Sequence, residues 1–173
     1  MTGKPLRRLL LIEDNRGDAR LLREMLDEEG LRDTEVSHVD RMSEGAALLA
    51  RGDFDLILLD PGRRDGECAE AVRRAHAAAP RVPLVVLTGQ DDEALALKAL
   101  QEGAEDYLVK GKIDTRSLLR ALRYAIERKV LEEALFAEKE RAQVSLKCIG
   151  DAVLCTDLEG RITVDATLTG NAR

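Results

Sequence analysis

Several polar side chains of this 173-residue chain have the chemical types that a phosphoryl-transfer site requires. Carboxylates bind Mg²⁺ and can attack phosphorus, while a hydroxyl or an ammonium can contact phosphoryl oxygens. Each of these side chains ends or directly follows a short apolar run. They are Glu13 and Asp14 after residues 9–12, Asp60 after residues 56–59, Thr88 after residues 84–87 and Lys110 after residues 107–109. Together they predict a cation site beside an anion site.

The apolar runs have the length of buried strands, and segments with helical spacing separate them. A weaker strand is expected around Val36 and Val39. Helices are expected at residues 17–29, 43–50, 68–79 and 93–102. This alternation of strand and helix predicts an α/β protein with a doubly wound parallel sheet. In such a sheet ligands bind beyond the carboxyl ends of the strands, so the polar side chains should converge there.

Four segments carry a resemblance to a known family. They read LLIEDN at residues 10–15, DLILLD at residues 55–60, VVLTG at residues 85–89 and DYLVK at residues 106–110. In this order they resemble the receiver domain of two-component response regulators over roughly the first 125 residues. The resemblance implies a flavodoxin-like sheet of five strands in the order 2-1-3-4-5.

The resemblance also implies roles for individual residues. Asp60 would accept a phosphoryl group from a histidine kinase or a phosphotransfer protein, and Thr88 and Lys110 would contact its oxygens. Thr88 and Tyr107 would form the switch pair that responds to phosphorylation. We therefore expect a phosphorylation-controlled signalling switch, whose chemistry is limited to its own phosphoryl transfer and dephosphorylation.

A magnesium ion is implied by the same resemblance. Its ligands would be the carboxylates of Glu13, Asp14 and Asp60, with the carbonyl oxygen of Gly62 as a further ligand. The charges of these residues also favour a bound cation, because clustered carboxylates raise one another's pKa values unless a cation neutralises them. Hard oxygen ligands of this kind select Mg²⁺.

Two loops depart from the family's pattern. The loop after the predicted phosphoacceptor begins with Pro61, which has no backbone N–H to offer a phosphoryl oxygen. It continues with Arg63 and Arg64, which either stabilise the phosphoryl group or face solvent. Gly111 stands where most receivers have a cis proline, and a non-proline peptide bond strongly prefers trans. We expect a different loop shape there, and the sequence does not predict the effect on phosphorylation kinetics.

A long uninterrupted helix is predicted after the last strand. Asp114 or Thr115 can cap it, and no proline or glycine follows until Gly150. Its first part should pack on the sheet, and its later part has the alternating four- and three-residue steps of a coiled-coil seam. The seam positions are Leu131, Leu135, Glu138, Ala142, Ser145 and Ile149. The helix either frays in solvent past Arg128 or, as we prefer, pairs with its copy in a homodimer.

The patterns divide the chain into three regions. Residues 1–128 form the receiver, residues 129–149 a coiled-coil-like linker helix, and residues 150–173 a tail. Residues 145–163 resemble the start of a PAS sensor domain, with a helix, a strand, a glycine turn and a second strand. The tail is too short for a whole PAS domain. We therefore expect it to be incomplete or disordered, in the front end of a longer signalling protein or a truncated product.

The composition of the chain limits the kinds of partner that it can bind. A net charge of −6 and a pI near 5.1 argue against direct nucleic-acid binding. No apolar run approaches the ~20 residues of a membrane-spanning helix, so we expect a cytoplasmic protein without a membrane partner.

Two other functions remain open from the sequence. A degenerate receiver would act as a constitutive dimerisation or docking module, and a flavodoxin-like cofactor enzyme would share the sheet order. The joint presence of Glu13, Asp14, Asp60, Thr88 and Lys110 favours the switch. A cofactor enzyme would need neither the acidic pair nor the lysine.

Overall fold

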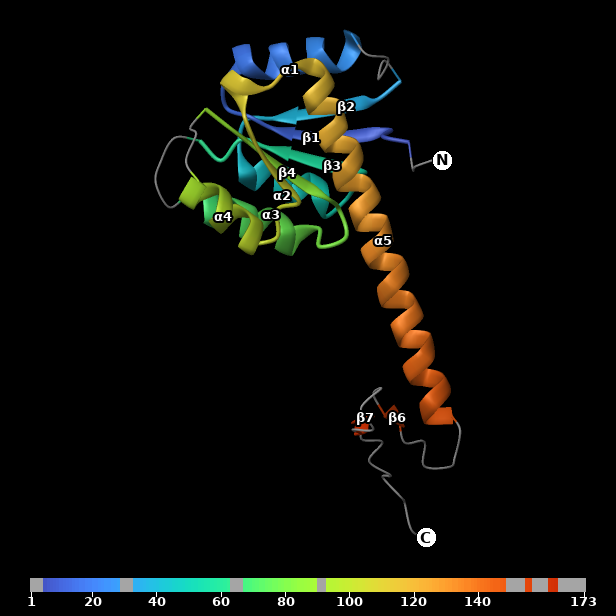
Figure 1. The fold of residues 1–173 in the computed structure, drawn as a ribbon. Coiled ribbons are helices and arrows are strands. Elements are labelled where there is room, and N and C mark those ends of the chain that lie inside the picture. Colours follow the sequence, from blue (N-terminus) through green and yellow to red (C-terminus); the bar gives the residue numbers. More distant parts are fainter. Residues whose placement is uncertain are drawn as a thin grey trace. The chain divides into compact units, whose positions relative to one another are not determined.

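The computed structural model of the protein describes residues 5–28, 33–62, 67–89, 93–148, 155–156 and 162–164. Its main sheet has five parallel strands in the order β2-β1-β3-β4-β5 (Figure 1). This order confirms the predicted flavodoxin-like α/β fold. The strands are β1 (Arg8–Ile12), β2 (Glu35–Val39), β3 (Leu56–Leu59), β4 (Leu84–Thr88) and β5 (Asp106–Val109).

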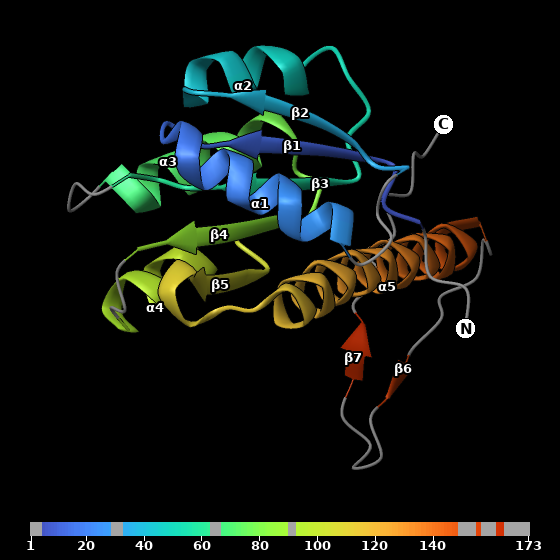
Figure 2. The ribbon, with the colours of Figure 1, turned by 90° about the horizontal axis from the view of Figure 1, so that it is seen from above.

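Helices cover both faces of this sheet. They are α1 (Arg16–Glu28), α2 (Met42–Leu49), α3 (Glu67–Ala78), α4 (Glu93–Gln101), the 3₁₀ turn η1 (Lys110–Lys112) and α5 (Thr115–Cys148). Figures 1 and 2 show α1 and the first part of α5 against one face, with α2, α3 and α4 against the other. The predicted helices are therefore present: α1 to α4 each connect two strands of the doubly wound sheet, and α5 follows its last strand.

The core has two halves because successive strand residues point to opposite faces. Leu9 and Leu11 of β1 pack in the cluster under α1 and α5, while Leu10 and Ile12 pack in the cluster under α2, α3 and α4. All four are at most 2% exposed. Burial on both faces explains why these strands read as continuous apolar runs rather than as alternating patterns.

The last helix has a buried and an exposed part. Leu118, Leu122 and Ile126 of α5 are buried against the sheet, whereas Leu131 and Leu135 are each 69% exposed. The helix is continuous from Thr115 to Cys148, so the predicted long helix is confirmed. Whether its exposed part pairs with a second copy stays a prediction.

The chain divides into two compact units, residues 1–131 and residues 132–173. The second contains the end of α5 and a two-stranded antiparallel sheet of β6 (Cys155–Thr156) and β7 (Ile162–Val164). Most of the predicted PAS start lies outside the described residues, so that assignment stays a prediction. Among the described helices, none combines the length and apolar character that crossing a membrane requires.

The close contact between α2 and β1 supports the strand end that carries Glu13. A Cβ atom placed on Gly45 of α2 would lie 2.6 Å from Cδ1 of Ile12, which is only 2% exposed. We expect Gly45→Ala to lower the free energy of unfolding by about 1 kcal/mol, because overpacking outweighs alanine's helix preference. Urea denaturation measures this effect. In an Ile12→Val background the closest atom is gone, and an equally large cost there would contradict the steric explanation.

Candidate functional site

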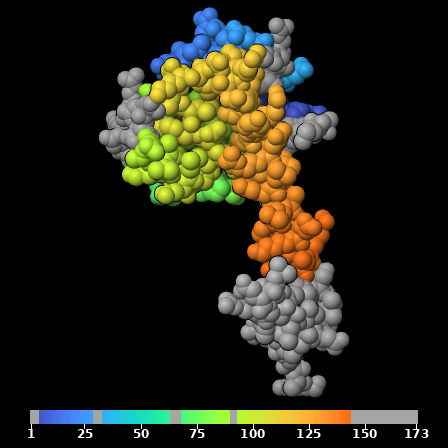
Figure 3. All heavy atoms as spheres, in the orientation of Figure 1, coloured from blue at the N-terminus to red at the C-terminus, as the bar shows by residue number. Residues whose placement is uncertain are grey.

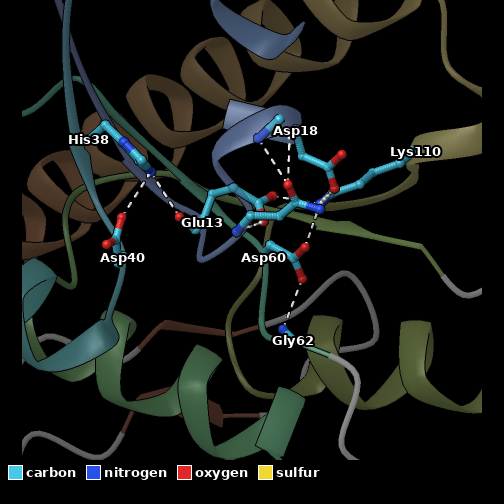
Figure 4. Close-up of polar contacts among 9 residues, drawn as sticks. Glu13, Asp18, His38, Asp40, Asp60, Gly62 and Lys110 are labelled. Atoms are coloured by element: carbon cyan, nitrogen blue, oxygen red, sulfur yellow. Dashed lines mark hydrogen bonds and ion pairs between the residues drawn. The ribbon is translucent and has the colours of Figure 1, made fainter. Parts of the chain in front are cut away.

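The sheet register brings the predicted polar side chains to one edge. Ile12 pairs with Leu59 and Thr88 pairs with Val109, so the residues that follow these strands lie side by side. The ladder continues one step further, because the N–H of Asp60 donates to the carbonyl of Ile12 at 2.9 Å. Figure 4 shows the side chains that meet at this edge.

The ammonium of Lys110 lies at the centre of the site. Its Nζ is 2.5 Å from Oε2 of Glu13, 2.6 Å from Oδ2 of Asp18 and 2.5 Å from Oδ2 of Asp60 (Figure 4). Burial by itself lowers the pKa of Lys110, but the hydrogen bonds to Asp18, Asp60 and Glu13 outweigh it and raise the pKa overall. The lysine is therefore held as a cation by acids from three different elements.

Glu13 is the most deeply buried acid of the site, at 1% exposed. Burial raises its pKa, and the hydrogen bonds from Lys110 and from the backbone N–H of Asn15 partly offset that rise. Its own N–H donates to the carbonyl of Val39 at 3.0 Å, and its carbonyl accepts from Nε2 of His38 at 2.8 Å. The side chain of Glu13 is thus held by the site, and its backbone is held by residues of β2.

The loop after Asp60 provides a backbone donor to its carboxylate. Oδ1 of Asp60 accepts a hydrogen bond from the N–H of Gly62 at 2.8 Å. Gly62 has φ +81°, a left-handed conformation that glycine adopts without strain. Pro61 has no N–H, and the first backbone donor after Asp60 is thus that of Gly62, which bonds the carboxylate itself. Arg63 and Arg64 lie outside the described residues, and the proposed metal-binding role of the Gly62 carbonyl is not tested.

Asp18 is a member of the site that the sequence reasoning missed. Glu13, Asp18 and Asp60 each place a carboxylate oxygen within 4.8 Å of the others, and in the described part of the chain this is the group suited to a metal ion. Asp18 lies in the first turn of α1, which returns it to the strand end. The sequence signal that could have identified Asp18 is an acidic residue in the first turn of the helix that follows β1. Asp14, predicted as a ligand, is exposed and is not in this group.

Thr88 and Tyr107 occupy neighbouring strands. Thr88 ends β4 at the site edge and is 4% exposed. Tyr107 of β5 pairs with Val86 and is partly buried against the cluster under α2, α3 and α4. Gly111 lies in the η1 turn, and all peptide bonds among the described residues are trans, as expected at this position. The two predicted switch residues thus lie on adjacent strands, and their role as a switch pair stays a prediction.

A curated relative shares this sequence pattern. The KDP operon transcriptional regulatory protein KdpE of Escherichia coli is 34% identical over 102 residues, which are 59% of this chain and 44% of that protein. The chain therefore spans less than half the length of this relative.

Solved structures share the fold. A response regulator protein from Burkholderia pseudomallei, with a phosphorylated aspartic acid, a calcium ion and citrate, is 26% identical with a TM-score of 0.59. The similarity covers 82% of this chain and 84% of that one. The receiver domain of a sensor histidine kinase from Pseudomonas aeruginosa, with a magnesium ion in its active-site cleft, is 27% identical with a TM-score of 0.60. There the coverage is 71% of this chain and 99% of that one.

A family model matches the receiver part of the chain as a whole. The model of the response regulator receiver domain matches residues 9–123, which include every predicted site residue. With the five-stranded sheet and the acidic edge around Lys110, this match shows that the chain belongs to the response regulator receiver domain family of two-component signalling.

Proposed function

We propose that this receiver is an active switch in which Asp60 is the phosphoacceptor. The observation that carries the proposal is the ammonium of Lys110 held at 2.5 Å from Asp60 among three carboxylates. An acidic cluster around a half-buried lysine at one sheet edge is the arrangement that phosphoryl transfer to a carboxylate needs. The phosphorylated aspartic acid of the Burkholderia pseudomallei protein supports the same assignment.

The transfer follows from these contacts. An oxygen of the Asp60 carboxylate attacks phosphorus and forms the acyl-phosphate bond, while the bond from phosphorus to a nitrogen of the donor histidine breaks and leaves its electron pair on that nitrogen. Lys110 neutralises one phosphoryl oxygen, and the Thr88 hydroxyl donates to another. The histidine belongs to a histidine kinase or a phosphotransfer protein.

The acids also fit a magnesium ion. Carboxylate oxygens are hard ligands, and the three that cluster here offer one atom each within 4.8 Å. Glu13 and Asp60 would hold the cation, with Asp14 and the Gly62 carbonyl as further ligands. Bound Mg²⁺ supplies positive charge that neutralises the phosphoryl group. Asp18 would then keep its contact with Lys110, which without the cation contacts all three acids.

The signal would leave through the surface of α4, β5 and α5. Figure 3 shows α4 and the first part of α5 on one face of the receiver, in green-yellow and orange. When the Thr88 hydroxyl bonds a phosphoryl oxygen, the end of β4 moves toward the site and Tyr107 can turn into the vacated space. A switch of this kind needs only a bistable element with a small energy gap. The change then reaches a downstream output module through α5, whose exposed part would pair in a homodimer.

The first prediction concerns the phosphoacceptor. With acetyl phosphate and Mg²⁺, we expect the wild-type chain to gain one phosphoryl group and Asp60→Asn to gain none, because the amide is no nucleophile and a poor cation ligand. Intact mass spectrometry measures the shift. Asp53→Asn, in an exposed loop, is the matched control and should behave as wild type. Equal labelling of Asp60→Asn would refute the assignment, and no labelling of any variant would favour the degenerate receiver.

The second prediction concerns Lys110, whose ammonium competes with Mg²⁺ for the acidic cluster and contacts the phosphoryl group. Lys110→Ala frees oxygens of Glu13, Asp18 and Asp60, so we expect Mg²⁺ to bind up to about tenfold more tightly, a change of about 1.4 kcal/mol. The phosphorylation-induced conformational change should be lost, because the phosphoryl group loses its charged partner. Calorimetry and amide NMR measure the two effects. Lys112→Ala, in the same η1 turn, is the control. Weaker Mg²⁺ binding in Lys110→Ala would contradict the competition argued here.

The third prediction concerns the exposed part of α5. We expect a dimer of about micromolar affinity, because the seam contains Glu138 and Ser145 among its apolar positions. The double variant Leu131→Glu/Leu135→Glu and a chain ended at Arg128 should be monomers in analytical ultracentrifugation. Phe136 is 62% exposed but lies off the seam, so Phe136→Glu is the matched control and should still dimerise. A monomeric wild type at high concentration would overturn the coiled-coil assignment.

A further inference from the structure

A second charged site lies beside the phosphoryl site, beyond Glu13. A pocket of about 450 Å³ opens between α1 and the carboxyl end of β2, within the usual size range of small-molecule sites. In Figure 4, Glu13 lies between Lys110 and His38, which lines this pocket. The lining residues are Arg16, Ala19, Arg20, Arg23, His38 and Asp40.

The lining of the pocket carries three arginines and one acid, Asp40, so its formal charge is positive in a chain of net charge −6. Its three arginines follow one another in steps of four and three residues, which places them on one face of α1. Arg20 pairs with Glu24 at 2.9 Å. Arg16 and Arg23 form no ion pair with any residue that the structure describes. Two guanidinium groups are therefore available to a ligand in a pocket that Ala19 also lines.

The opposite wall of the pocket is connected to the phosphoryl site. Nε2 of His38 donates to the carbonyl of Glu13 at 2.8 Å, and the carboxylate of Asp40 lies 3.7 Å from the same nitrogen. The side chain of Glu13 contacts Lys110. A ligand that displaced His38 would thus act directly on the backbone of a residue of the phosphoryl site.

We propose that this pocket binds a small phosphate-bearing anion and that its occupancy is transmitted to Glu13 through His38. Guanidinium groups match phosphate oxygens in a bidentate geometry, and a pocket with two free arginines favours an anion with several such oxygens. The site is distinct from Asp60 and Lys110, so it would let a phosphorylated metabolite or nucleotide adjust the acidic cluster. This inference does not depend on Asp60 being the phosphoacceptor.

Titration of the full chain with inorganic pyrophosphate, without Mg²⁺, tests the binding. We expect saturable binding by calorimetry, weakened at least about tenfold in Arg16→Gln/Arg23→Gln, because both bidentate partners are lost. The control Arg51→Gln/Arg81→Gln removes the same charge from exposed positions elsewhere and should bind as wild type. Absence of saturable binding, or an equal loss in the control, overturns the site.

Amide NMR of the same titration tests the transmission. We expect the resonances of Ala19, Glu13 and Asp14 to shift in the wild type and in His38→Gln, which can still donate to the Glu13 carbonyl. In His38→Leu the shift of Ala19 should remain while those of Glu13 and Asp14 shrink. Shifts centred on Asp60 and Lys110 instead would overturn the proposal. So would tighter binding of a poly-glutamate peptide than of pyrophosphate, which would identify a docking surface for an acidic protein.

Discussion

The contact of one ammonium with three carboxylates is the interaction on which the rest of this site depends. Glu13, Asp18 and Asp60 come from the end of β1, from α1 and from the end of β3, and Lys110 follows β5. Without a cation the three acids would repel one another across a few ångströms at low local dielectric. The lysine therefore holds four separate segments together at the edge where we propose that phosphoryl transfer takes place. A metal ion that binds the same oxygens must compete with that lysine, which couples cation binding to the position of η1.

Local patterns predicted the elements that position the site, and long-range geometry decided its details. Buried strands read as apolar runs, and a residue that ends such a run must lie at the carboxyl edge, so Glu13, Asp60, Thr88 and Lys110 could be placed from the sequence. Asp18 could not be placed as readily, because its position depends on how the first turn of α1 packs on β1. The Gly62 donor was missed for a similar reason, since it required a left-handed turn after Pro61.

The last helix shows where sequence reasoning reaches its limit. The absence of proline and glycine was enough to predict one continuous helix, and the buried stripe around Leu118 and Leu122 is a local consequence of helical periodicity. Leu131 and Leu135 are apolar and exposed within the described chain. The partner of these leucines cannot be predicted from one chain. A coiled-coil seam is buried only by a second helix, and the register of the pair depends on both helices.

Glu13 connects the two charged regions of the receiver. Its carboxylate belongs to the Lys110 cluster, while its N–H and carbonyl are bonded to Val39 and to the imidazole of His38. Because the residue is fully buried, neither side can move without disturbing a hydrogen bond that water cannot replace. A small displacement of His38 must therefore either move the end of β1 or break the contact between His38 and Glu13. This rigidity is why a ligand at the proposed second site would act on the acidic cluster through the end of β1.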